Sequence, residues 1–190
     1  MRSMKKFGVL AVVAFALSAI GAANASAVPT FTASATGSLT GKATNTQVFK
    51  TSGGEVKCNT AATSGTITST ASPEQHVTVN YSGCTAFGFP VHITPATYLF
   101  TANGEVHIKN TITLEVTVPF LPDCHVTVGP QTRKSVGYVP NGNNLIVSAN
   151  VTGIVYTTTG GACGSSGNAG TYTGNNEVSR VGGGSVGWHP

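Results

Sequence analysis

The sequence predicts an all-β protein, an antiparallel sandwich of the immunoglobulin-like or jelly-roll-like kind with about ten short strands and two disulfides. Three observations support this prediction. Short runs alternate apolar and polar residues between Gly, Pro, Asn and Ser, which is typical of strands that bury one face. Residue pairs that favour tight turns separate some of these runs. Four cysteines follow an export signal. The mature chain shows no apolar stripe typical of an amphipathic helix.

The alternation is clearest in four segments. Their apolar positions are Val77, Val79 and Tyr81; Ile112, Leu114, Val116 and Val118; Cys124, Val126 and Val128; and Leu145, Val147, Ala149 and Val151. Because successive side chains of a strand point to opposite faces, each segment has one face for a core and one for water. Strands of this kind close as a sandwich or as a barrel, and we expect the sandwich.

Turn residues mark where the chain reverses between strands. Asn103-Gly104 is the strongest hairpin signal, because both residues tolerate a positive φ. Ser52-Gly53-Gly54 is expected to form a second hairpin turn. The segment from Pro119 to Asp123 is expected to be a corner, since Pro cannot donate a hydrogen bond within a sheet.

The first residues have the order of a secretory signal peptide. Arg2, Lys5 and Lys6 precede an apolar run that ends near Ile20, and small residues follow it. We expect a signal peptide over 1–27, cleaved after Ala25 or Ala27. The apolar run is shorter than the roughly 20 residues of a membrane helix, and no second such run follows. We therefore expect a secreted, extracellular protein, at the cell surface or free, without a membrane span.

The remaining chain is predicted to be one domain with a tail. A single sandwich domain is expected over 28–181, because a chain of this length forms one core. The glycine-rich residues 182–190 are expected to be flexible.

Charge excludes a nucleic-acid function. Charged residues make up 8% of the chain, about a third of the usual share of roughly 25%. Removal of the signal leaves seven basic residues (10 − 3) against six acidic ones. The basic residues are scattered, whereas a nucleic-acid site needs them clustered on one face.

The four cysteines predict two disulfides. Cys58, Cys84, Cys124 and Cys163 all follow the signal, and export brings them to an oxidising compartment. Of the three pairings that four cysteines allow, we expect Cys58–Cys84 and Cys124–Cys163, which close short loops. Each would stabilise the fold by about 3–4 kcal/mol. No Cys-x-x-Cys spacing indicates a metal site.

Histidines are the strongest candidates for a metal site. His92, His107 and His125 each precede Val or Ile in a predicted strand, as does His76, so alternation directs them to the polar face. Two histidines on neighbouring strands could share a metal, with a third ligand from Glu105, Glu115 or Asp123. The alternative is a set of solvated histidines, and no spacing favours the metal.

No catalytic motif lies in a suitable context. Two facing carboxylates would suit a glycosidase, but nothing singles out a pair among the six acidic residues. The segment Gly183–Gly187 matches the nucleophile-elbow pattern without the strand and helix that this motif requires. We therefore predict that the protein is not an enzyme and that it has no catalytic residue and no cofactor.

Two aromatic residues are candidates for surface binding. Phe87-Gly88-Phe89-Pro90 follows Cys84 on a predicted loop. If exposed, Phe87 and Phe89 could stack on a sugar ring or bind a protein partner. The alternative is that both rings plug one end of the sandwich, which is the usual fate of large apolar side chains.

Several phrases of the chain resemble a group of exported bacterial proteins rich in Thr and Gly, whose activity is not known. These phrases are Gly54–Cys58, Tyr81–Gly88, Cys124–Val128 and Gly170–Gly174. The resemblance implies export and an all-β fold, and it implies no mechanism. Members of the group have further cysteines near the positions of Ala96 and Ile108, which this chain lacks.

From these observations we expect a secreted, non-catalytic β domain with a structural, cell-surface or binding role. Its partner is unknown, and a surface glycan or a protein is a candidate. One alternative is a carbohydrate-binding or adhesin-like module that uses Phe87 and Phe89. Another is a metal-dependent hydrolase that uses the strand histidines.

Overall fold

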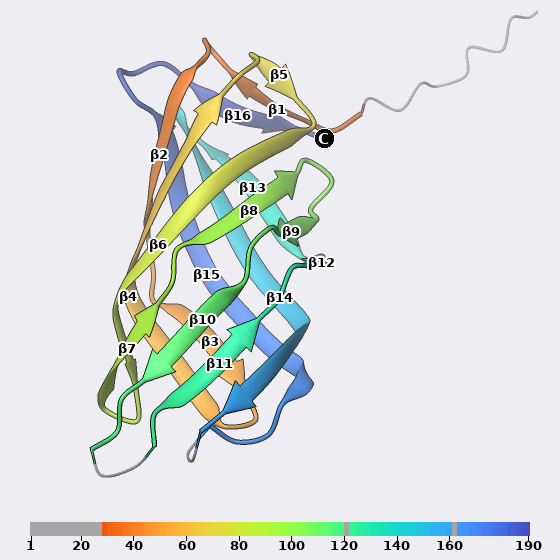
Figure 1. Ribbon diagram of the computed structural model, residues 1–190. Coiled ribbons are helices and arrows are strands. Elements are labelled where there is room, and N and C mark those ends of the chain that lie inside the picture. Colours follow the sequence, from red (N-terminus) through yellow and green to blue (C-terminus); the bar gives the residue numbers. More distant parts are fainter. Residues whose placement is uncertain (1–27, 120–121, 161–162) are drawn as a thin grey trace, which may run out of the picture.

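The protein is built from β-strands alone in the part that the structure describes. The computed structural model describes residues 28–119, 122–160 and 163–190, and none of them is in a helix (Figure 1). The predicted class, an all-β antiparallel fold with two disulfides, is confirmed. The signal peptide predicted over 1–27 lies outside the described residues. No helix able to span a bilayer is found in the described ranges.

The described residues form sixteen strands instead of about ten, because the long strands pair with different short strands along their length. The four longest are β4 (Gly54–Ile67), β6 (Glu74–Ala86), β14 (Asn144–Thr159) and β15 (Gly167–Arg180). The others, apart from three at one end of the molecule, are β2 (Gly37–Ala43), β3 (Gln47–Thr51), β7 (Phe89–Ile93), β8 (Ala96–Thr101), β9 (Val106–Ile108), β10 (Ile112–Val116), β11 (Cys124–Val128), β12 (Gln131–Arg133) and β13 (Val136–Asn141).

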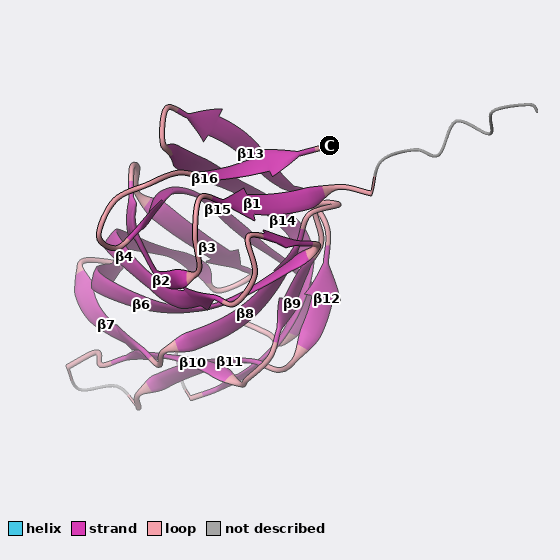
Figure 2. Ribbon diagram, turned by 90° about the horizontal axis from the view of Figure 1, so that it is seen from above, coloured by secondary structure: helices cyan, strands magenta, loops and turns pink. Residues whose placement is uncertain are grey.

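The lower half of the molecule in Figure 1 is a closed ring of paired strands. Eight strands follow one another through backbone pairing, in the order β3, β4, β6, β7, β10, β11, β14, β15, and β15 pairs again with β3. We call these eight strands the ring. Two halves of one sheet therefore face each other across the core in a sandwich-like arrangement whose edges are joined. Figure 2 shows the strands around this interior from above.

The upper half continues the wall with different strands. β2 replaces β3 between β15 and β4, and β8 replaces β7 beside β6. Beyond β8, the wall ends with β9 and β12, while β13 extends it from β14. No backbone ladder joins β12 to β14 among the described pairings. We call this gap between β12 and β14 the seam.

A separate three-stranded sheet covers the upper end. It consists of β1 (Thr30–Ala33) between β5 (Ala71–Ser72) and β16 (Val186–His189), and we call it the cap. The structure corrects the flexible tail expected over 182–190, since Val186–His189 is a strand. Trp188 holds this strand in place, because its indole N–H donates to the Ala102 carbonyl at 2.7 Å and its ring lies 5.9 Å from that of Tyr138.

The core follows the alternation that the sequence predicted. Val77, Val79 and Tyr81 of β6 are buried, while His76 and Asn80 between and beside them are exposed. Both disulfides form as expected, Cys58–Cys84 between directly opposed residues of β4 and β6, and Cys124–Cys163 between β11 and the segment before β15. The hairpin at Asn103-Gly104 joins β8 to β9, with Gly104 at a φ of 87°.

Candidate functional site

The interior of the closed sheet contains a cavity. Its volume is about 150 Å³, and its wall is formed chiefly by apolar side chains. The wall includes residues of the cap, such as Phe31, and residues of the ring, such as Phe49 and Val151. A closed sheet of about eight strands has an interior that is either filled by side chains or just wide enough for one small ligand. This cavity corresponds to the second case.

Tyrosine hydroxyls supply polar points in the apolar wall. The hydroxyls of Tyr81 and Tyr98 are 3.0 Å apart and buried, and they meet where β6 changes partner from β8 to β7. The Tyr172 hydroxyl donates to Oε1 of Gln47. Burial raises the pKa of Tyr98 to about 12 and that of Tyr81 well above its ordinary value. These phenols therefore stay neutral and can donate or accept hydrogen bonds.

Gln47 anchors this polar group. Its side chain is fully buried, and its amide nitrogen donates to the carbonyl oxygens of Asn45, at 2.9 Å, and Asn175, at 3.2 Å. These hydrogen bonds fix the orientation of the Gln47 amide, so its Oε1 is directed at the Tyr172 hydroxyl. Nearby, Asn176 donates to the Thr63 hydroxyl at 2.9 Å, whereas its own buried carbonyl oxygen Oδ1 has no hydrogen-bond partner among the described residues.

The seam is closed by a side chain and contains a cation. The Gln131 amide donates to the Val155 carbonyl at 2.9 Å and accepts from the Val155 N–H at 2.9 Å, so it replaces one step of a backbone ladder. Arg133, two residues further along β12, lies in the cavity wall. Its Nη1 donates to the Thr132 carbonyl at 2.7 Å. Its buried Nε has no hydrogen-bond partner in the described part of the chain.

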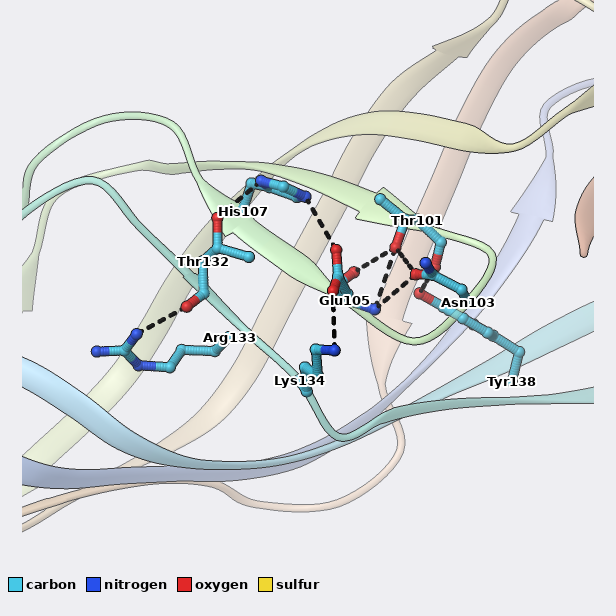
Figure 3. Close-up of polar contacts among 8 residues, drawn as sticks. All are labelled: Thr101, Asn103, Glu105, His107, Thr132, Arg133, Lys134 and Tyr138. Carbon is cyan, nitrogen blue, oxygen red and sulfur yellow. Dashed lines mark hydrogen bonds and ion pairs between the residues drawn. The ribbon is translucent and has the colours of Figure 1, made fainter.

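The outer face of the seam has a separate polar network, shown in Figure 3. The Thr132 hydroxyl and Nδ1 of His107 are 2.9 Å apart. Glu105 pairs with Lys134 at 3.2 Å, and its other oxygen is 3.8 Å from Nε2 of His107. The hydroxyl–imidazole–carboxylate order resembles that of a hydrolase triad, but 3.8 Å is too long for a hydrogen bond. Lys134 also neutralises the carboxylate, so the network does not activate Thr132.

The histidines predicted as a metal site are divided between two places. His92 of β7 and His125 of β11 lie directly opposite Glu115 of β10, one on each side. His107 lies on β9, apart from them in the sheet order, so His92, His107 and His125 do not form one site. Within the described residues no three His, Cys, Asp or Glu side chains are placed to hold a metal ion together.

The two predicted aromatic binding residues are also separated. Phe87 is 67% exposed at the tip of the β6–β7 hairpin, with a φ of 53° that is rare for a bulky residue. Its ring lies over Gly54, where an added Cβ would be 2.3 Å from the Phe87 Cζ. Phe89 is half-buried and packs against the core. Phe89 therefore belongs to the edge of the core, whereas Phe87 is presented to solvent.

The cavity residues were not among the sequence candidates. The sequence does not single out Arg133, because nothing in it shows that 131–133 is a strand with its odd-numbered residues directed inward. Of the tyrosines in the wall, the alternation places Tyr81 in a core and indicates no cavity. One feature of the sequence could have indicated the site: Arg133 is a cation two residues from Gln131 in a chain with few charged residues. No family model, no curated protein and no solved structure matches this chain.

Proposed function

We propose that this chain is an exported, non-catalytic binding domain that holds one small apolar molecule inside its closed sheet. The cavity of about 150 Å³ with its apolar wall is the observation that supports the proposal most directly. Empty space beside apolar side chains loses dispersion contacts, so a cavity lined by residues of both the cap and the ring favours a ligand-binding role. The two disulfides are compatible with an oxidising compartment outside the cell.

The volume limits the ligand. Pockets for drug-sized molecules usually measure roughly 300–1,000 Å³, about two to seven times this cavity. An apolar cavity of about 150 Å³ in another protein stays dry and binds benzene. The ligand therefore has an apolar body of about one six-membered ring or a short acyl chain.

Fluorobenzene, followed by fluorine NMR, tests the proposal. We expect saturable binding to the purified, oxidised protein. Ala149 lines the cavity, so Ala149→Leu should fill it and weaken binding by at least about tenfold. Asn150→Leu is the matched control, since Asn150 is the exposed next residue of the same strand, and it should leave binding unchanged. A folded wild-type protein that does not bind fluorobenzene would contradict the proposal.

A second candidate function is carbohydrate binding through Phe87. The observation that favours it is a solvent-exposed ring on a hairpin tip with an unusual φ, because strained exposed residues concentrate at binding sites. A sugar ring could stack on the open face of the phenyl group. On a glycan array, Phe87→Ala should abolish retention and Ala149→Leu should preserve it. Retention that survives Phe87→Ala would exclude this ring as the site.

A further inference from the structure

We infer that the ligand of the cavity is a small carboxylate, whose apolar body lies in the cavity and whose negative charge is received by Arg133. This inference rests on the proposed function, since it names the chemical class of the molecule that the cavity binds. It goes further in assigning a residue to recognition and a charge to the ligand.

The direction of Arg133 follows from the register of β12. Arg133 lies opposite Val106 of β9, and Thr132 lies opposite His107. Val106 is buried in the core, whereas His107 belongs to the outer network with Thr132. Because side chains alternate along a strand, Arg133 is on the inner face, in agreement with its place in the cavity wall.

Arg133 has no acidic partner inside the protein. Every Asp and Glu of the sequence lies in the described part of the chain, and none is within ion-pair distance of this guanidinium. Glu105, which directly precedes the partner strand β9, pairs with Lys134 in the outer network. Lys50, the other cation in the cavity wall, pairs with Glu55 at 2.8 Å. Arg133 is half-buried, and its guanidinium has no counter-charge within the described residues, so an anion beside it would add a favourable charge–charge contact.

The free donors of Arg133 fit a carboxylate. A guanidinium has five N–H groups in a planar fork that matches the two oxygens of a carboxylate. The only hydrogen bond of this side chain within the described residues is the one from Nη1 to Thr132. The edge formed by Nε and Nη2 is thus without a protein acceptor, and Nε is already withdrawn from water. Side-on binding of one carboxylate would satisfy that edge.

Position at the seam gives the charged group a way to reach solvent. The seam is bridged by the Gln131 side chain rather than by paired backbone. A carboxylate held by Arg133 would therefore lie near the wall, while its apolar body extends toward Val147 and Val151 in the interior. An amphiphilic acid fits this arrangement, because its carboxylate would meet Arg133 at the wall and its apolar body would meet the apolar side chains of the interior.

Three probes of one shape test the inference: benzoate, benzamide and benzylamine, measured by calorimetry on the oxidised protein. If the cavity had no cation, benzoate and benzylamine would both bind more weakly than benzamide, because each would lose the hydration of its charge. We expect benzoate to bind at least about tenfold more tightly than benzamide, since a hydrogen bond to a charged group has that magnitude. Benzylamine should bind more weakly than either.

Two adjacent cations provide the matched variants. Arg133→Gln should remove the preference for benzoate and leave benzamide affinity within about twofold, because only the charge and the fork are lost. Lys134→Gln removes a neighbouring positive charge that faces outward, and it should leave the preference intact. Arg133→Lys, which keeps the charge without the fork, should retain part of it.

The outcomes separate the two proposals. If benzamide binds and benzoate binds no more tightly, or if Lys134→Gln lowers benzoate affinity as much as Arg133→Gln does, the carboxylate assignment is wrong and the apolar site stands. If none of the three probes, nor fluorobenzene, binds to the folded wild-type protein, the proposed function fails as well. The wild-type probe series decides the charge preference even if Arg133→Gln does not fold.

Discussion

The two ends of the molecule are closed in different ways. At the lower end the ring is continuous, because each of its eight strands pairs with the next through backbone hydrogen bonds. Both disulfides lie in this half, on β4, β6 and β11. At the upper end the wall is interrupted by the seam and closed by side chains, chiefly Gln131, Tyr138 and Trp188. The same sheet therefore has one half closed by backbone pairing and one half closed by side chains.

This difference suggests how the interior is reached. A backbone ladder opens only when several hydrogen bonds break together, whereas a side-chain bridge can open through a rotamer change. Because the seam is bridged by the Gln131 side chain instead of a backbone ladder, we expect the interior to be reached from the upper half. Variants in the ring should change mainly the free energy of unfolding, whereas variants at the seam should change mainly how fast a ligand enters the cavity.

The largest effect is expected from a disulfide of the ring. Cys124 and Cys163 are 39 residues apart, and removing a cross-link over a loop of this length lowers the free energy of unfolding by about 4 kcal/mol. Urea denaturation of the double variant Cys124→Ala, Cys163→Ala measures this loss. The oxidised wild-type protein is the reference, because reduction would break Cys58–Cys84 as well. A double variant as stable as the oxidised protein would show that the ring does not depend on this staple.

Alkaline pH should act on the boundary between the halves. The pKa of Tyr98 is raised from 10.0 to about 12 in the folded state because the phenol is buried. Unfolded Tyr98 ionises first, so its contribution is fully present below pH 10 and is lost as the pH rises toward 12. Two pKa units correspond to about 3 kcal/mol. Denaturation at pH 9 to 12 (roughly the range set by these two values) measures the loss.

Tyr98→Phe is the control for the alkaline titration. It removes the ionisable hydroxyl and the contact with Tyr81, so the variant should be less stable at neutral pH and should lose less stability at high pH. An unchanged pH dependence would show that the other buried tyrosines determine the alkaline transition.

The cap should contribute less than the ring. Trp188 is half-buried, contacts Tyr138 and donates to Ala102. Trp188→Ala should lower the free energy of unfolding by about 2 kcal/mol, below the range for a fully buried aromatic side chain. Trp188→Phe keeps a ring and loses the hydrogen bond, which should reduce the effect to about 1 kcal/mol. Equal losses in the two variants would indicate that the hydrogen bond, rather than the ring, fixes the cap.

Local patterns predicted the strands well because each depends on neighbouring residues. The alternation of Val77, Val79 and Tyr81 and the turn at Asn103-Gly104 are set within a few residues, and the structure has them as predicted. The pairing of cysteines followed from loop length. The outward direction of His92 and His125 followed from the same alternation.

Long-range pairing determined what the sequence did not predict. The ring closes through Tyr172 opposite Phe49, residues more than a hundred positions apart, and no local pattern specifies that register. Trp188 finds its partner, the Ala102 carbonyl, on a turn 86 positions away. The inward direction of Arg133 depends on the three-residue strand β12, which is too short to show a period. The cavity and its lining therefore depend on the closure of the sheet, which local sequence patterns do not determine.

The smallest effect on stability, and the most specific test of the seam, is expected from Gln131. Gln131→Ala removes two hydrogen bonds to the Val155 backbone, and water can replace them because this part of β14 is exposed. The free energy of unfolding should fall by only about 1 kcal/mol. Amide hydrogen exchange at Val155 should accelerate by at least about tenfold, and fluorobenzene should associate faster. Thr132→Ala changes the outer side of the same strand and should alter neither rate. If the Val155 amide exchanges no faster in Gln131→Ala, the side-chain bridge does not control opening, and the two halves are equally closed.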